Sequence, residues 1–240
     1  MSLPEDELCI MLPTINESEN LAILLPEIRK IFKMASILIV DDNSNDGTRD
    51  FLNSWKKQDP KLQVIFRNNR YGIGSAHMLG IEQISNLGFK FLITMDADLT
   101  HKVADAKLIF DALLNSDVVI GSRYLGSNDI EGWALHRRMM TKIGHWITVI
   151  FFLSNLDMSS GLRGYRLAST PISMLIRNCP SNYEFFFVST LVFLKSNLRI
   201  SQVRVVLQER GSGKSKMSLK LTLRGAGQLM LFGLRLRRIK

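Results

Sequence analysis

Residues 89–101 read FKFLITMDADLTH, an apolar run that ends abruptly in two aspartates. In an extended chain, side chains two positions apart leave on the same side, so Asp96 and Asp98 are expected to converge around Ala97. Two such carboxylates repel unless one is protonated or a cation lies between them. A site with so few protein oxygen ligands suits Mg²⁺ or Mn²⁺, because these ions complete their coordination with water and substrate phosphate. The stretch therefore predicts a metal-phosphate site; the alternative is an N-cap, Asp98 or Thr100, for the following helix.

Outside this stretch, the first 120 residues alternate short apolar runs with segments of helical periodicity. The apolar runs, typical of strands covered on both faces, lie at 8–12, 36–40, 62–66, 91–95 and 117–121. Helices are expected between them, near 17–33, 47–57, 74–86 and 103–114. This rhythm predicts an α/β fold with a mostly parallel sheet flanked by helices. Asn16 and Glu19 have capping-box spacing at the first helix, and Pro26 is expected to kink or divide it.

Charged residues and glycines follow the predicted strands. These groups are Asp41-Asp42, the loop 68–74, Asp96-Asp98 and Arg123. Because open sheets bind ligands beyond the carboxyl ends of their strands, we expect these groups to share one site. In the loop, Gly72 and Gly74 either allow backbone amides to approach a ligand or make the turn.

Charge is distributed unevenly along the 240 residues. Residues 1–120 hold 12 Lys and Arg against 17 Asp and Glu, whereas residues 121–240 hold 19 against 5. The net charge of +9 therefore combines −5 in the first half with +14 in the second. The second half is expected to meet an anion, either a phospholipid surface or a phosphorylated substrate, unless it is only a solvated basic face. A nucleic-acid partner is disfavoured because no recognition module is present.

The only cysteines, Cys9 and Cys179, lie far apart, which argues against a thiolate zinc site or a disulfide framework and favours a reducing compartment. The first residues lack the pattern of a secretory signal.

Two segments of the second half combine apolar and basic residues. They are WALHRRMMTKIGHWITVIFFLSNL at 133–156 and SLKLTLRGAGQLMLFGLRLRRIK at 218–240. The first is too short in its uninterrupted apolar stretch for a membrane span. We expect both to be helices in a membrane interface, with a core helix as the alternative. The sequence then divides into a domain of residues 1–217, which includes the helix near 133–156, and a C-terminal amphipathic membrane-associating helix at 218–240.

Eight blocks along the chain stand in the order found in the dolichol-phosphate mannose synthases. The blocks are LPTINESENL (12–21), VDDNSNDGT (40–48), RNNRYGIGSA (67–76), MDADLTH (95–101), GSRY (121–124), GWALHRR (132–138), DMSSGLRGYR (157–166) and ERGSGKSKMS (209–218). The sequence resembles that family over essentially its whole length. With the polyprenol-phosphate glucosyltransferases, the family belongs to the inverting family-2 glycosyltransferases of GT-A, Rossmann-like fold.

The resemblance implies roles for matching residues of the donor site. The nucleotide-sugar site would comprise Pro13, Glu17, Asp41, Asp42, Asp96, Ala97 and Arg123, with Arg123 near the diphosphate. A Mg²⁺ or Mn²⁺ ion would be held by Asp96, Asp98 and Thr100. In the family's D-x-T-S-G motif, Asp157, Ser159 and Ser160-Gly161 are the matching residues.

The acceptor site implied by the resemblance lies in the second half. The acceptor phosphate would meet Arg137, Thr141, Ser215 and Lys216, and the catalytic set would be Asp98, Arg137, Arg210 and Lys216. Arg210, Ser215 and Lys216 fit a mobile loop of the family that closes over the phosphates of both substrates. Departures from the family pattern are Ile15 for tyrosine, Asn43-Ser44 after Asp42, Thr100 for glutamine or serine, and Lys102 for proline.

The implied reaction is inverting transfer of a sugar to dolichyl or another polyprenyl phosphate. The Gly-Trp pair before Arg137 favours mannose from GDP-mannose over glucose from UDP-glucose. Two other hypotheses remain, a non-catalytic nucleotide-sugar-binding subunit of a membrane complex and a transferase for a soluble glycan. The expected location is the cytoplasmic face of the endoplasmic reticulum in a eukaryote or of the plasma membrane in a prokaryote, with membrane-anchoring subunits as possible partners.

Overall fold

A computed structural model of the chain describes residues 2–126 and 135–208, without the side chains of residues 135–137 and 140. Its strands are β1 (Leu8–Thr14), β2 (Ser36–Asp41), β3 (Leu62–Phe66), β4 (Phe91–Thr94), β5 (Val118–Ser122), β6 (Arg163–Arg166) and β7 (Ile200–Arg204). Its helices are a 3₁₀ turn (Glu5–Glu7), α1 (Ser18–Ile31), α2 (Thr48–Lys56), α3 (Ile73–Asn86), α4 (Val103–Ala112), α5 (Leu135–Phe152), α6 (Ile172–Asn178) and α7 (Glu184–Lys195).

The strands form one seven-stranded sheet in the order β3-β2-β1-β4-β6-β5-β7. Strand β6 is antiparallel to both of its neighbours, and the other pairings are parallel. The predicted mostly parallel sheet of an α/β, GT-A-like fold is therefore confirmed. The parallel arrangement brings the carboxyl ends of β1, β2, β4 and β5 to one edge of the sheet.

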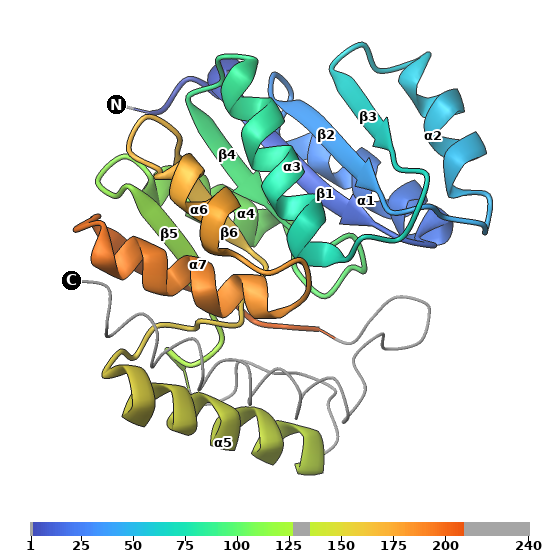
Figure 1. The fold of residues 1–240 in the computed structure, drawn as a ribbon. Coiled ribbons are helices and arrows are strands. Elements are labelled where there is room, and N and C mark those ends of the chain that lie inside the picture. The colour runs from blue at the N-terminus through green and yellow to red at the C-terminus, as the bar shows by residue number, and fades with distance from the viewer. Residues whose placement is uncertain (1, 127–134, 209–240) are drawn as a thin grey trace.

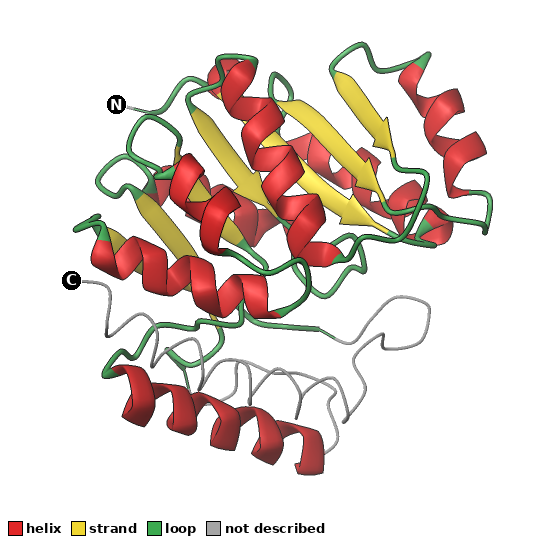
Figure 2. Cartoon of the chain, in the orientation of Figure 1, coloured by secondary structure: helices red, strands yellow, loops and turns green. Residues whose placement is uncertain are grey.

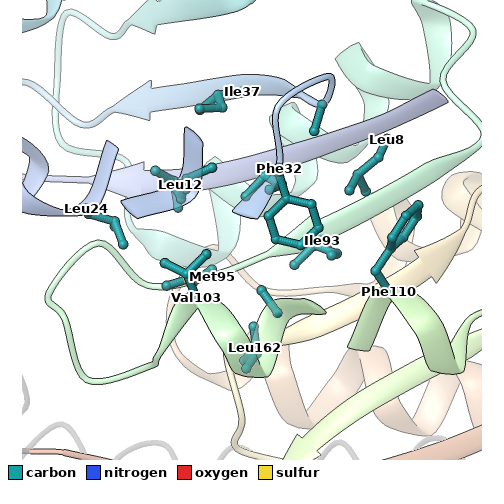
Figure 3. Packing of buried hydrophobic residues seen from close by; sticks show 14 of the residues in the cluster. Leu8, Leu12, Leu24, Phe32, Ile37, Ile93, Met95, Val103, Phe110 and Leu162 are labelled. Atoms are coloured by element: carbon teal, nitrogen blue, oxygen red, sulfur yellow. The ribbon is translucent and has the colours of Figure 1, made fainter. Parts of the chain in front are cut away.

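Helices cover both faces of the sheet, so the core has two layers (Figure 2). Alternate residues of β1 divide between them: Leu8, Ile10 and Leu12 face α1 and α4, whereas Cys9 and Met11 face α3 and α7. In the first layer, Phe32 meets the ring of Phe110 edge to face at a centroid distance of 6.2 Å (Figure 3). Phe91 meets the same ring edge to face at 5.8 Å. Burial on both faces explains why these strands are almost wholly apolar.

The five predicted strands and four predicted helices of the first 120 residues are confirmed to within a few residues. Two details differ. Helix α1 runs unbroken through Pro26, so of the two expected effects, a kink or a division, the division is wrong; the buried face of the helix, which includes Leu24, Leu25 and Ile28, packs on the sheet. Its N-cap is Glu17 and makes no side-chain cap hydrogen bond, while the Asn16 side chain accepts the backbone N–H of Asn45 instead. The capping box is therefore absent from α1.

Helix α5 lies outside the two layers that cover the sheet (Figure 1). It contacts the body through Tyr124, whose hydroxyl donates to the Thr141 carbonyl at 3.3 Å and whose ring stacks on His145 at a centroid distance of 3.7 Å. The other side of the helix exposes large apolar side chains, among them Ile143, Trp146 and Ile150. Within the described parts of the chain, no helix combines the length and the hydropathy that crossing a membrane requires.

A buried histidine predicts the acid sensitivity of the fold. His77 on α3 is 0% exposed, packs against the rings of Phe185 and Phe186, and has no hydrogen-bond partner for either ring nitrogen among the described residues. Burial lowers the pKa of His77 to about 3 from 6.5. Between these pH values the unfolded chain binds a proton that the folded chain does not, so stability is full above pH 6.5 and falls with the pH.

Because of this difference in proton binding, we expect the free energy of unfolding to fall by about 2 kcal/mol between pH 7 and pH 5. In His77→Leu, that share of the pH dependence should disappear, whatever the variant's stability at pH 7. Urea unfolding of both proteins at the two pH values measures it. Equal losses in the two proteins would contradict the assignment.

Candidate active site

Asp98 lies in a tight turn between β4 and α4. It is 5% exposed, and its Oδ1 accepts the Thr100 backbone N–H at 3.1 Å and the Thr100 hydroxyl at 2.6 Å. Leu99 has a φ of 64° in this turn. Helix α4 begins after Lys102, which makes no side-chain cap bond, so the N-cap alternative for Asp98 or Thr100 is wrong.

The Asp96 side chain is 32% exposed, more than that of Asp98. The His101 Nε2 lies 3.9 Å from the Asp96 Oδ2, but burial lowers the pKa of His101 to about 4, so the ring is neutral at pH 7 and carries no charge to balance the carboxylate. Gly161 packs directly on the other side, because a Cβ atom there would lie 2.9 Å from Asp96 Oδ1. The carboxylate therefore fits in a space that only a glycine leaves.

The donor set of this turn fits a sparsely held divalent cation. Asp96 and Asp98 offer hard carboxylate oxygens, and Thr100 adds a hydroxyl, which is what Mg²⁺ and Mn²⁺ bind when substrate phosphate supplies further ligands. In residues 2–126 and 135–208, no cluster of three or more His, Cys, Asp or Glu forms a complete protein cage for a metal.

Arg123, just beyond β5, is held by the loop that precedes β6. Its Nε and Nη2 donate to the two carboxylate oxygens of Asp157 at 3.0 Å and 3.2 Å, and Nη2 also donates to the Ser159 hydroxyl. Asp157 is 1% exposed, so this bidentate ion pair is shielded from solvent. The same loop, residues 157–161, therefore contacts both Arg123 and Asp96.

Asp41, at the end of β2, is fully buried and organises the neighbouring loop. Its carboxylate accepts the Thr14 hydroxyl at 3.3 Å, the Ser44 backbone N–H at 3.1 Å and the Ser44 hydroxyl. Arg49 lies 3.6 Å away. These contacts tie the tips of β1 and β2 together.

Asp42 anchors a second loop. Its two carboxylate oxygens accept the backbone N–H groups of Tyr71 and Gly72, each at 3.0 Å, and Arg67 lies 3.1 Å away as a buried counter-ion. Gly72 and Gly74 are needed for packing, since a Cβ atom on either would lie within 2.6 Å of residues 180–182. This packing role was not among the two considered from the sequence, and both of those stay predictions.

Glu17 and Pro13 flank Asp41. The Glu17 backbone N–H donates to the Thr48 hydroxyl at 3.1 Å, its carboxylate accepts from Asn20 at 2.6 Å, and Pro13 pairs with Val40 across β1 and β2. Pro13, Glu17, Asp41 and Asp42 thus gather at the ends of β1 and β2, and Asp96, Ala97, Asp98 and Thr100 at the end of neighbouring β4. Whether the first group holds a nucleoside stays a prediction.

The acceptor residues are described only in part. Thr141 lies on α5, and its carbonyl meets Tyr124, the neighbour of Arg123. Arg137 belongs to α5 by its backbone, but its side chain lies outside the described residues, as do Arg210, Ser215 and Lys216. Their roles remain those implied by the resemblance.

Sequence reasoning missed two arginines that build this region. Arg67 balances Asp42, and Arg163 is fully buried behind the loop 157–161. Both lie inside the blocks that carry the resemblance. Nothing in the order of residues distinguishes a buried arginine from a solvated one.

Gly161→Ala should damage the site more than the fold. The new methyl group would push against Asp96, so we expect Mn²⁺-dependent nucleotide binding to weaken about tenfold or more, the scale of an ångström-sized misplacement. Gly164→Ala is the matched control, because its methyl group would meet Ile109 Cγ2 at 2.5 Å in the core instead. Titration calorimetry and thermal melts of both variants test this. The expectation fails if Gly164→Ala loses more binding than Gly161→Ala.

The chain is similar to a known protein family and to named relatives. Residues 9–173 match the model of the family described as glycosyl transferase family 2. An undecaprenyl-phosphate mannosyltransferase of Micrococcus luteus is 31% identical over 209 residues, which cover 87% of this chain and 86% of that protein. A polyprenol monophosphomannose synthase of Mycolicibacterium smegmatis is 29% identical over 220 residues, covering 90% and 82%.

Solved structures share the fold at lower identity. A glucosyl-3-phosphoglycerate synthase of Mycobacterium tuberculosis, in complex with Mn²⁺, uridine diphosphate and phosphoglyceric acid, superimposes with a TM-score of 0.70 at 14% identity. The match covers 94% of this chain and 78% of that one. At this identity the likeness establishes the fold alone.

Proposed function

This chain belongs to glycosyltransferase family 2, and from that premise we propose that it transfers mannose from GDP-mannose, with inversion, to dolichyl or another polyprenyl phosphate at a membrane surface. The chain is a glycosyltransferase by its family, and the named activities of its two mannosyltransferase relatives support the sugar and the acceptor. The observation that carries the proposal is the loop 157–161, which joins the open Asp96 carboxylate to the Arg123–Asp157 pair.

The leaving group of the reaction is a nucleoside diphosphate. Asp96, Asp98 and Thr100 would hold a Mg²⁺ or Mn²⁺ ion, which when bound neutralises charge on the diphosphate. Arg123, oriented by Asp157, would add a fixed positive charge next to it. Pro13, Glu17, Asp41 and Asp42 would border the nucleoside, because the parallel sheet brings them to the adjacent strand ends.

The acceptor needs orientation more than activation. A phosphate monoester has a second pKa of about 6, so it is largely dianionic at neutral pH and requires no strong general base. Arg137, Arg210 and Lys216 would hold it in line with the departing diphosphate, assisted by Thr141 and Ser215. The position of Thr141 beside Tyr124 supports a path from α5 to the donor site.

A membrane surface suits α5. Ile143, Trp146, Ile147 and Ile150 have helical spacing on one face and are 55%, 66%, 47% and 66% exposed, and Lys142 beside them is also exposed. Such a face can lie in the lipid headgroup region while basic residues meet anionic lipid. We propose that residues 1–217 form the transferase domain and that 218–240, which lie outside the described residues, form a membrane-associating helix. The proposed location is the cytoplasmic face, with anchoring subunits as proposed further partners.

One experiment separates the candidates. The purified protein is incubated with dolichyl phosphate, Mn²⁺ and radiolabelled GDP-mannose, UDP-glucose or other sugar nucleotides, and label in the organic phase is counted. We expect label from GDP-mannose. Label only from UDP-glucose would replace the sugar, donor binding without transfer would indicate a non-catalytic subunit, and label passing only to soluble glycans would reject the lipid acceptor.

A further inference from the structure

Arg163 is a fully buried arginine at the start of β6. It reaches back to the preceding loop: its Nε donates to the Ser160 carbonyl at 2.8 Å and its Nη2 to the Met158 carbonyl at 3.0 Å. The planar guanidinium thus bonds two backbone carbonyls that lie two residues apart. A lysine ammonium cannot reproduce this fork, since it is a single point of charge.

The other side of Arg163 faces α7. Its Nη1 donates to the Ser189 hydroxyl at 2.8 Å and its Nη2 to the Phe186 carbonyl at 2.8 Å, while the guanidinium lies 5.3 Å from the centre of the Phe186 ring. All four acceptors are neutral. Arg163 therefore joins the loop 157–161 to a helix of the core.

Burying this charge is unfavourable for stability alone. Removing a guanidinium from water costs several kcal/mol, and an apolar side chain of similar size often packs at lower cost. The hydrogen bonds offset part of that cost, and they hold the backbone of the loop in one conformation. Arg163 therefore stabilises one conformation of the loop, although an apolar side chain there could give a higher free energy of unfolding.

The loop held by Arg163 forms one wall of the donor site. Gly161 packs against the Asp96 carboxylate, and its carbonyl accepts the Thr94 hydroxyl at 2.9 Å. Asp157, at the other end of the loop, orients Arg123. A shift of the loop would therefore move both groups that are assigned to the diphosphate.

We propose that Arg163 is a positioning residue for the donor diphosphate: its fork fixes the backbone of residues 158–161 and so sets the separation of Asp96 and Arg123. The inference rests on the proposed function of that site. Arg163 is 0% exposed, so it acts through the loop and not on the substrate.

Three variants test the inference. Arg163→Lys keeps the charge and loses the fork; Thr94→Val removes the other hydrogen bond to the loop without disturbing a charge. Ser189→Ala is the matched control, because it removes a buried partner of Arg163 on the α7 side and leaves the loop bonds in place. For each we measure the melting temperature, the Mn²⁺-dependent binding of GDP and UDP by calorimetry, and amide hydrogen exchange at residues 158–161.

We expect Arg163→Lys and Thr94→Val to weaken nucleotide binding about tenfold or more and to speed exchange at 158–161, a loss on the scale of a small misplacement. The nucleotide affinity of Ser189→Ala should stay within about twofold of the wild-type value, the range of a contact outside the site. This should hold even if its melting temperature falls as far as those of Arg163→Lys and Thr94→Val. If Arg163→Lys does not fold, Thr94→Val alone decides. Binding losses that simply follow melting temperature across the variants would overturn the inference.

The two proposals fail in different ways. Absence of transfer to polyprenyl phosphate by the wild type, with Mn²⁺-dependent nucleotide binding intact, would reject the function and leave the positioning role supported or overturned by the binding data. If the wild type transfers the sugar and the Arg163→Lys variant binds nucleotide normally, only the positioning role is rejected.

Discussion

Asp98→Asn should reduce sugar transfer by about a thousandfold or more while the fold remains intact. Neutralising charge on a leaving diphosphate is worth several kcal/mol, and each 1.4 kcal/mol changes the rate tenfold. The amide keeps an oxygen that can accept from Thr100, so the turn before α4 should survive. Asp98→Ala should lose activity equally. Initial rates with saturating donor and Mn²⁺, together with circular dichroism, measure both effects.

The matched control is Asp111→Asn on α4. Asp111 has a half-exposed side chain and pairs with Lys107 on the helix surface, so its neutralisation removes a carboxylate that is remote from the site and contributes little to stability. Its transfer rate should equal that of the wild type. Substantial turnover by Asp98→Asn in excess Mn²⁺ would contradict the assignment of Asp98 as a metal ligand.

Replacing the apolar face of α5 should detach the protein from membranes. In the triple variant Ile143→Ser, Trp146→Ser, Ile150→Ser, each position loses a side chain whose full burial is worth about 1.5–3 kcal/mol. We therefore expect binding to phospholipid vesicles to fall by about a hundredfold or more. Transfer to long-chain polyprenyl phosphate in vesicles should fall with it.

The control triple is Ile23→Ser, Leu108→Ser, Leu114→Ser. These side chains are 56%, 50% and 44% exposed, comparable to the α5 face, but they belong to the α1 and α4 side of the molecule. Vesicle sedimentation should not distinguish this protein from the wild type. Both triple variants should still act on a short, water-soluble isoprenyl phosphate. Equal vesicle binding by the two triples would remove α5 from the membrane contact.

Much of the fold follows from local sequence patterns. The runs LCIML, SILIV and FLITM are nearly all apolar because helices cover both sides of their strands, so these strands and the mostly parallel character of the sheet were predictable. By contrast, β6 reads Arg-Gly-Tyr-Arg and carries no apolar run, although it lies inside the sheet, between β4 and β5. Its pairing depends on the strands at either side, which local patterns do not contain.

In the candidate site too, local patterns predicted some features and not others. Asp96 and Asp98 were expected to converge because residues two apart in an extended chain share a side, and Asp41 and Asp42 were expected at the end of another strand. The structure adds what these carboxylates contact: Asp42 holds the backbone of Tyr71 and Gly72, and Asp96 lies against Gly161. Those partners are 29, 30 and 65 residues away along the chain, so no short-range pattern specifies them.

The order of residues by itself determined the α/β architecture, the edge of the sheet at which we expect ligands and the paired carboxylates that predict a cation there. Tertiary structure alone decided that Arg123 is paired with Asp157 and that Arg163 is buried under the loop that joins both sides of the site. The physical reason is the separation along the chain over which each kind of interaction acts. Periodicity and turn chemistry act within a few residues, whereas desolvation and hydrogen bonding of an arginine depend on whichever distant segments fold around it.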